Sequence, residues 1–177
     1  TFGGPLTGYP GMKAELTFRG IRVEVDCGSH VQRHYRSASL VHTSSVVAHL
    51  EPPIDLGLVV RPGTSLAMPT FAPPSGLSGW LMRHAVQGHY GDRGISIGDT
   101  ALEANLYLWA REPHRLRALL LNPAVRHGLL GASSMLRVTM DDERIRFGYT
   151  GMIVGNLATW MIHDVAWLTQ AIAHAAR

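Results

Sequence analysis

Two pairs of short segments in which apolar and polar residues alternate constrain the fold of this chain more than any other feature. The first pair spans residues 14–25 and turns at Arg19-Gly20, and the second spans residues 136–147 and turns at Asp141-Asp142. Alternation with a period of two is typical of strands buried on one face, and a tight turn between two such segments indicates a β-hairpin. The sequence therefore predicts a sheet built from antiparallel hairpins.

Further strands are expected between and after these hairpins. β-branched residues recur over residues 35–50, where we predict one long strand with a bulge at Ser44-Ser45. Residues 56–61 (LGLVVR) and residues 106–111 predict two more strands. Residues 27–34 (CGSHVQRH) predict a connection, because they are polar and carry no clear alternation.

Short helices are expected in the second half of the chain. Asp99 can cap a helix over residues 100–104, because aspartate accepts hydrogen bonds from the first helical N–H groups. Glu112-Pro113 opens the next helix, since proline suits a first turn. A third helix is predicted over residues 124–130, with Gly131 as its stop.

A long amphipathic helix is predicted over residues 152–175. Its apolar stripe recurs every three or four residues, at Leu157, Met161, Val165, Leu168 and Ile172. Trp160, Trp167 and Ala171 widen that stripe, and we expect this flank to contact a partner because it exceeds what one sheet needs. The alternative is that the whole helix packs into its own core.

These elements predict an α+β fold: a mainly antiparallel sheet of hairpins with short helices and the long C-terminal helix packed on it. The 177 residues suit one domain. We expect an N-terminal arm over residues 1–11 and a single domain over residues 12–177. Within that domain, residues 62–94 are rich in Pro and Gly and form a long excursion.

Charge argues against nucleic acid as a partner. The formal net charge is +3, and Lys13 is the only lysine, but the arginines are spread along the chain. A nucleic-acid site would favour basic residues gathered into a patch and interleaved with aromatics, which this sequence lacks.

The chain has no run of about 18 apolar residues, so we expect no transmembrane segment in this piece. No secretory signal is visible either, and we expect a cytoplasmic or membrane-associated location rather than secretion. Because the sequence starts at Thr1, we expect a processed protein or an excised fragment, which leaves room for membrane attachment through a missing N-terminal part.

One catalytic pattern is present, Gly94-Ile95-Ser96-Ile97-Gly98, which fits the G-x-S-x-G turn that exposes a serine nucleophile. Ser96 would also need an acid and a histidine. The candidates for these roles are Asp141, Asp142, His163 and His174. Hydrolases with this motif need strands alternating with helices, whereas this chain predicts hairpins, so a Gly-Asp turn before a short helix explains the same residues.

A metal site is the second candidate. Cys27, His30 and His34 supply one thiolate and two imidazoles, a ligand set that suits zinc. The two histidines need a helix to converge, and no fourth ligand is evident, so the alternative is a polar connecting segment. Cys27 is the only cysteine, which excludes an internal disulfide.

The long excursion holds a third group of candidates. Its polar and aromatic residues cluster near its end, and they are candidates for a binding cleft: His84, His89, Tyr90 and Arg93.

Three segments and the closing helix resemble a group of bacterial domains of unknown function that often follow membrane-spanning segments. The segments are EPPIDLGLVVRPG (51–63), residues 97–130 and LRVTMDDERIRF (136–147). Gly98-Asp99 and Glu103 fit the pattern of these domains, although Leu102 stands where an aromatic residue is typical. The resemblance implies that Gly98-Asp99 is a structural turn, and it carries over no catalytic residue.

We therefore expect a non-enzymatic binding or assembly domain, the soluble part of a larger or membrane-attached bacterial complex. A protein partner or a second copy is expected, and no cofactor. The alternatives are a small serine hydrolase using Ser96 and a metal-binding protein using Cys27, His30 and His34.

Overall fold

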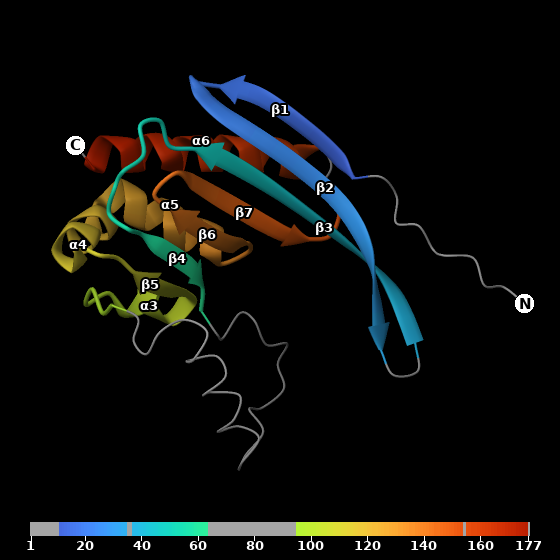
Figure 1. Ribbon diagram of the computed structural model, residues 1–177, viewed down its shortest axis with the longest axis horizontal. Coiled ribbons are helices and arrows are strands. Elements are labelled where there is room, and N and C mark those ends of the chain that lie inside the picture. Colours follow the sequence, from blue (N-terminus) through green and yellow to red (C-terminus); the bar gives the residue numbers. More distant parts are fainter. Residues whose placement is uncertain (1–10, 35–36, 64–94, 154, 177) are drawn as a thin grey trace, which may run out of the picture.

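The computed structural model describes residues 11–34, 37–63, 95–153 and 155–176, and their strands form one antiparallel sheet (Figure 1). The strands are β1 (Met12–Phe18), β2 (Ile21–His34), β3 (Ser37–His49), β4 (Val59–Pro62), β5 (Leu106–Trp109), β6 (Arg137–Asp141) and β7 (Arg144–Thr150). The helices are α3 (Thr100–Asn105), α4 (Pro113–Leu121), α5 (Pro123–Ser133) and α6 (Asn156–Ala175). The seven strands lie in the order β1-β2-β3-β7-β6-β4-β5, which confirms the predicted α+β class.

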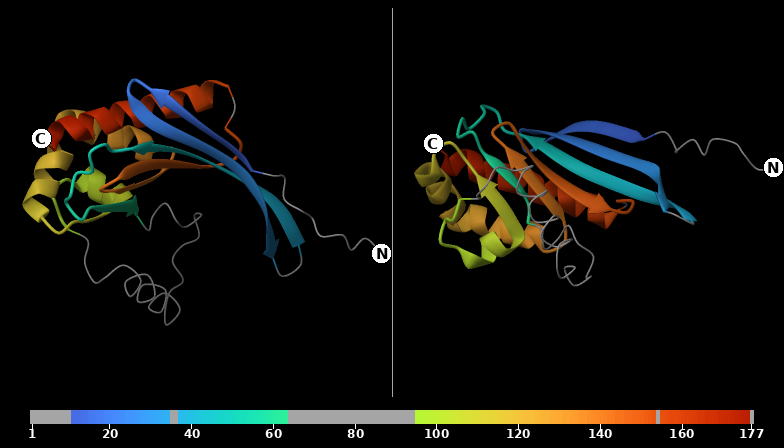
Figure 2. Two further views of the ribbon diagram at one scale, coloured as in Figure 1. Left: turned by 45° about the horizontal axis from the view of Figure 1, so that its top comes forward. Right: turned by 60° about the horizontal axis from the view of Figure 1, so that its bottom comes forward.

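The helices lie on one side of the sheet (Figure 2). α6 contacts β1, β2, β3 and β7, while α5 packs against α6 and β6. The core between these layers is apolar, and among its largest fully buried side chains are Ile145, Phe147 and Met161. At one edge the Gln170 Nε2 group donates a hydrogen bond of 3.0 Å to the Arg19 carbonyl, which ties α6 to the β1–β2 turn.

The first predicted hairpin is present and turns at Arg19-Gly20. Both turn residues have positive φ, 52° and 78°, as a two-residue hairpin turn requires. Val23 and Val25 of β2 are buried beneath α6, as their alternation predicted.

The prediction of a connection at residues 27–34 is wrong, because β2 continues through them to His34. Every residue from Val23 to His34 pairs with one of β3, in a register that runs unbroken from Ala48 to Ser37. Pairing along a partner strand thus overrides the weak strand preference of these Gly, Ser and His residues.

The same register shows that the predicted bulge at Ser44-Ser45 is wrong. Ser44 instead points into the core, where its hydroxyl donates to the Gly151 carbonyl at 2.8 Å and accepts from the Ile153 amide at 3.2 Å. Ser44 therefore holds the connection from β7 to α6 in place, and β3 runs through both serines without interruption.

The strand predicted over residues 56–61 begins only at Val59. The backbone N–H groups of Leu56, Gly57 and Leu58 donate to the carboxylate of Asp142 instead of to a neighbouring strand, at 3.0, 2.7 and 3.0 Å. A side chain in the β6–β7 turn thus replaces the ladder bonds that this segment would otherwise make.

The helix boundaries also differ from those predicted. α5 runs through Gly131 to Ser133, so this glycine does not stop it. α6 begins at Asn156 rather than at residue 152, since Gly151 and Gly155 both have a positive φ, which a right-handed helix does not contain. Within the described part of the chain, no helix combines the length and the hydropathy needed to cross a membrane.

Candidate binding face

The face of the sheet opposite the helices, called the polar face below, gathers most of the charged strand residues. Paired residues on neighbouring antiparallel strands point to the same side, so the register defines its members. They include Lys13, Glu15, Arg22, Glu24, Asp26, Ser45, Val47, His49, Val59, Arg61, Tyr107, Trp109, Arg137, Thr139, Asp141, Arg144 and Arg146. The polar face is therefore built from all seven strands.

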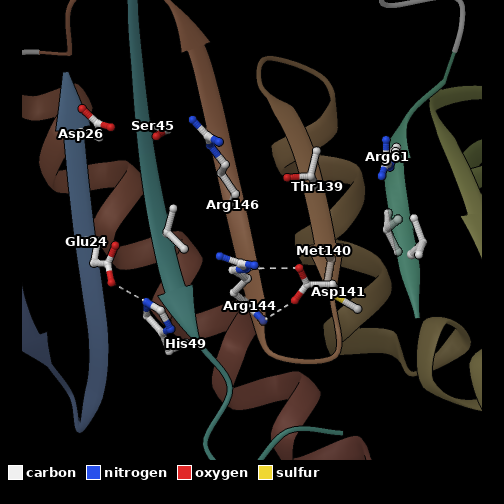
Figure 3. A pocket seen from close by; sticks show the side chains of 13 residues that line it. Glu24, Asp26, Ser45, His49, Arg61, Thr139, Met140, Asp141, Arg144 and Arg146 are labelled. Carbon is white, nitrogen blue, oxygen red and sulfur yellow. Dashed lines mark hydrogen bonds and ion pairs between the residues drawn. The ribbon is translucent and has the colours of Figure 1, made fainter. Parts of the chain in front are cut away.

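A shallow hollow of about 580 Å³ lies in the middle of the polar face (Figure 3). Its charged lining comes from four strands, with Glu24 and Asp26 on β2, Arg144 and Arg146 on β7, Asp141 on β6 and Arg61 on β4. β3 lies between those two strands and contributes Ser45, Val47 and His49.

His49 is held by two neighbours on β2. Its Nδ1 accepts a hydrogen bond from Arg22 Nη2 at 2.9 Å, so Nε2 carries the proton and donates to Glu24 Oε1 at 2.9 Å. Because both ring nitrogens are bonded, this imidazole orients Glu24 and is poorly placed to take a proton from a substrate.

The two arginines of β7 differ in their surroundings. Arg144 Nε donates to Asp141 Oδ2 at 3.2 Å, and Asp141 Oδ1 also accepts from the Glu143 and Arg144 amides. Arg146 is exposed, and within the described ranges it makes no hydrogen bond or ion pair. Of the two β7 guanidinium groups in the hollow, that of Arg144 is restrained and that of Arg146 is available to a ligand.

The serine candidate Ser96 lies just before α3, with an acid beside it. Its hydroxyl donates to Glu103 Oε1 at 3.0 Å, and the same oxygen accepts from the amides of Ile97 and Gly98 at 2.7 and 2.8 Å. The Ile97 amide first, and then the Ser96 hydroxyl, lower the pKa of Glu103 below its usual value. Ser96 therefore takes part in a turn around an ionised carboxylate.

The proposed partners of Ser96 are engaged elsewhere. The Asp142 carboxylate bonds the amides of residues 56–58, and Asp141 bonds Arg144. The His163 ring lies against Phe18, with 4.5 Å between the ring centroids. For His174 no bond to either acid is found in the described structure. The described residues assemble no Ser-His-acid arrangement around Ser96.

The metal candidates are separated by the strand that contains them. Cys27 and His30 are three residues apart on β2, so their side chains point to opposite faces of the sheet. The side chain of His34 lies outside the described part. Among the described residues, no group of three or more Cys, His, Asp or Glu side chains is arranged to hold a metal ion.

The flank of α6 predicted as a partner interface is partly used within the chain. Trp160 and Ala171 are half-buried against the core, and Trp167 is 39% exposed. Asp164 lies on the same flank, three or four residues from each tryptophan, and burial raises its pKa. The cleft candidates His84, His89, Tyr90 and Arg93 lie outside the described residues.

Sequence reasoning missed the polar face, although one local signal of it exists. The segment Arg144-Ile145-Arg146-Phe147 alternates arginine with core residues, which indicates two guanidinium groups on one face of a strand. The same pattern does not show that β2 lies two strands away from β7. That arrangement depends on β3–β7 pairing, which joins residues about a hundred positions apart.

No protein family model, no curated protein and no solved structure matches this chain.

Proposed function

We propose that this chain is a non-enzymatic binding domain whose polar face receives a carboxylate or a similar anionic group of its ligand. The observation that carries the proposal is Arg146, an exposed guanidinium in the lining of the hollow without a partner among the described residues. A planar guanidinium can bond both oxygens of a carboxylate at once, which gives direction as well as strength.

The neighbours of Arg146 support this role. Arg144 precedes it by two residues on the same face of β7, roughly 7 Å away along the strand. Asp141 holds Arg144 and partly neutralises it, whereas Val47 and Thr139 pair with Arg146 on either side and carry no charge. An anion would therefore be directed to Arg146.

N-acetyl-tri-alanine tests this proposal, because a carboxylate is its only charged group. In an ¹H–¹⁵N NMR titration, we expect shifts concentrated at the amides of residues 45–47 and 144–147. Arg146→Gln should weaken binding about tenfold, the size of one charge-assisted hydrogen bond. Arg137→Gln removes the same charge from the polar face outside the hollow and should leave the affinity unchanged. A wild-type protein without shifts on the polar face would contradict the proposal.

A second feature favours assembly as an additional function. β1 pairs with β2 only as far as Cys27, and β7 pairs with β3 only as far as Thr43. Beyond these points β2 and β3 project as a two-stranded ribbon, residues 28–34 and 37–42, seen at the lower right of Figure 1. An isolated pair of strands is only marginally stable in water, so we propose that the ribbon pairs with a second copy.

The edge of the ribbon is suited to such pairing. Residues 37–42 (SASLVH) contain no Lys, Asp, Glu or Pro, the residues that usually protect an exposed edge. Leu40 in this segment is 48% exposed. Light scattering after size-exclusion chromatography should show a dimer that Leu40→Lys dissociates. Leu121→Lys, at an exposed leucine of α4, is the control and should leave the dimer intact. A wild-type monomer at all concentrations would exclude self-assembly.

A further inference from the structure

We infer that the ligand of the polar face is zwitterionic, with a cationic group about 10 Å from the anionic group that Arg146 binds. This inference rests on the proposed function and adds the second half of the ligand. The distance follows from the sheet, because β2 and β7 are separated by two strand spacings of about 4.8 Å each. An extended peptide spans about 3.5 Å per residue, so a tripeptide with free ends is the simplest ligand of this kind.

The cationic group would meet the two acids of β2. Glu24 and Asp26 are two residues apart on the same face of the strand, and their side chains are 48% and 45% exposed. The nearest cation to Asp26 is Lys13, with Nζ at 3.9 Å and a side chain that is 81% exposed. A surface pair of that length contributes little, so Asp26 is available to a ligand.

Glu24 is oriented by His49, and one of its two carboxylate oxygens remains available to a ligand. Its Oε1 accepts from His49 Nε2 at 2.9 Å and lies 3.9 Å from Arg22, and its Oε2 makes no hydrogen bond with any described residue. The His49 bond holds the carboxylate at the edge of the hollow, as Figure 3 shows. A charged group that is already oriented loses less side-chain entropy when a ligand binds.

The surface between the two charged groups is short and uncharged. Glu24, Val47 and Arg146 form one row across β2, β3 and β7, and Ser45 is the next residue on the same side of β3. The backbone of a ligand crossing β3 would therefore meet small side chains and no competing charge. Only Val47 therefore lies between the Glu24 carboxylate and the available Arg146 guanidinium in this row.

The acids of β2 and the arginine of β7 lie on opposite sides of the hollow, which argues against a ligand that carries only a negative charge. Such a ligand would bond Arg146 while Glu24 and Asp26 across the hollow repelled it, which like charges at this range do. A cationic group at the far end of the ligand turns that repulsion into attraction. The same hollow therefore favours a zwitterion over either singly charged ligand.

Blocked and unblocked peptides test the inference. Tri-alanine carries both charges at pH 7, N-acetyl-tri-alanine only the carboxylate, and tri-alanine amide only the ammonium. By NMR titration at low salt, tri-alanine should bind about tenfold more tightly than either blocked peptide, the difference made by one charge-assisted contact. Asp26→Asn should reduce the preference for the free amine. Glu15→Gln, which removes a charge from β1 on the same face, should preserve it.

The outcomes separate this inference from the proposed function. If tri-alanine and N-acetyl-tri-alanine bind equally and Arg146→Gln weakens both, the zwitterion is wrong and the anion-binding function stands. If a preference for the free amine persists in the double variant Glu24→Gln/Asp26→Asn, the inference is also overturned. If no peptide shifts the polar face, the proposed function itself fails.

Discussion

Gly128 of α5 lies so close to Trp167 of α6 that a Cβ on this glycine would come within 2.8 Å of the indole Cζ3 atom. The same Cβ would lie 3.0 Å from Leu168 Cδ1. The absence of a side chain at Gly128 thus allows the two helices to approach each other. Trp167, predicted from the sequence to face a partner, already uses part of its surface for this contact.

Gly128→Ala is therefore expected to destabilise the protein. The added methyl group must displace two side chains, which costs about 1–3 kcal/mol, while alanine in a helix recovers up to about 1 kcal/mol. The net loss should be about 1 kcal/mol in the free energy of unfolding, measured with urea. Gly131→Ala on the same helix is the control, because nothing lies within 4 Å of its Cβ, and it should be stabilising. Equal effects at the two glycines would disprove the close contact.

Asp142→Ala should lower the free energy of unfolding more than Gly128→Ala does, because three backbone amides donate to the Asp142 carboxylate. Leu56, Gly57 and Leu58 all donate to it, and Leu56 and Leu58 are buried residues of the core. At about 1 kcal/mol for each lost bond, the free energy of unfolding should fall by about 3 kcal/mol. Asp141→Ala, in the same turn but more open to water, should cost about half as much. A larger loss of stability in Asp141→Ala than in Asp142→Ala would show that the segment 56–58 does not depend on Asp142.

This pair of aspartates illustrates what the sequence can and cannot predict. The turn at Asp141-Asp142 was predictable, because the alternation on both sides of it is local. The bonds from Asp142 to residues 56–58 were not, because they join segments more than eighty positions apart. The α+β class follows from local hairpins, whereas the candidate site follows from the order in which distant strands pair.

The ribbon is a second feature that local sequence patterns do not predict. Residues 27–34 have little intrinsic preference for a strand, and only their partner in β3 makes them one. The charges of the polar face are likewise ordinary surface residues in the sequence. That Glu24 and Asp26 of β2 face Arg144 and Arg146 of β7 across one strand becomes visible only when β3 is placed between them.

The turn around Ser96 gives a prediction that separates a structural serine from a nucleophile. Glu103 Oε1 accepts from the Ser96 hydroxyl and from two backbone amides, so Glu103→Ala removes three bonds and Ser96→Ala removes one. The thermal midpoint should fall further for Glu103→Ala than for Ser96→Ala. Treatment of the wild-type protein with a fluorophosphonate should leave Ser96 unlabelled. Labelling that disappears in Ser96→Ala would instead support the hydrolase.

Asp99 at the start of α3 leads to a prediction about the stability of the fold at low pH. Its carboxylate accepts from the amides of Ala101 and Leu102 at 3.1 and 3.2 Å, and it is paired with Arg126 of α5. The hydrogen bond from Arg126 is the main cause that holds the pKa of Asp99 below its usual value. The folded protein therefore binds fewer protons at this group than the unfolded chain does, at pH values near and below about 4.

A carboxylate with a lowered pKa contributes stability that is fully present above its unfolded pKa of about 4 and is lost as the pH falls through the folded value. Arg126→Met removes the main cause of the shift while it keeps an aliphatic side chain on α5. We expect the stability difference between wild type and Arg126→Met to be constant from about pH 7 to pH 5 and to shrink as the pH falls below about 4. Urea unfolding across this range measures both curves, and subtracting them cancels the contribution of Glu103, whose pKa is also lowered. A difference that stays constant down to the lowest pH would show that Arg126 stabilises the fold by packing on α5 and not through the charge of Asp99.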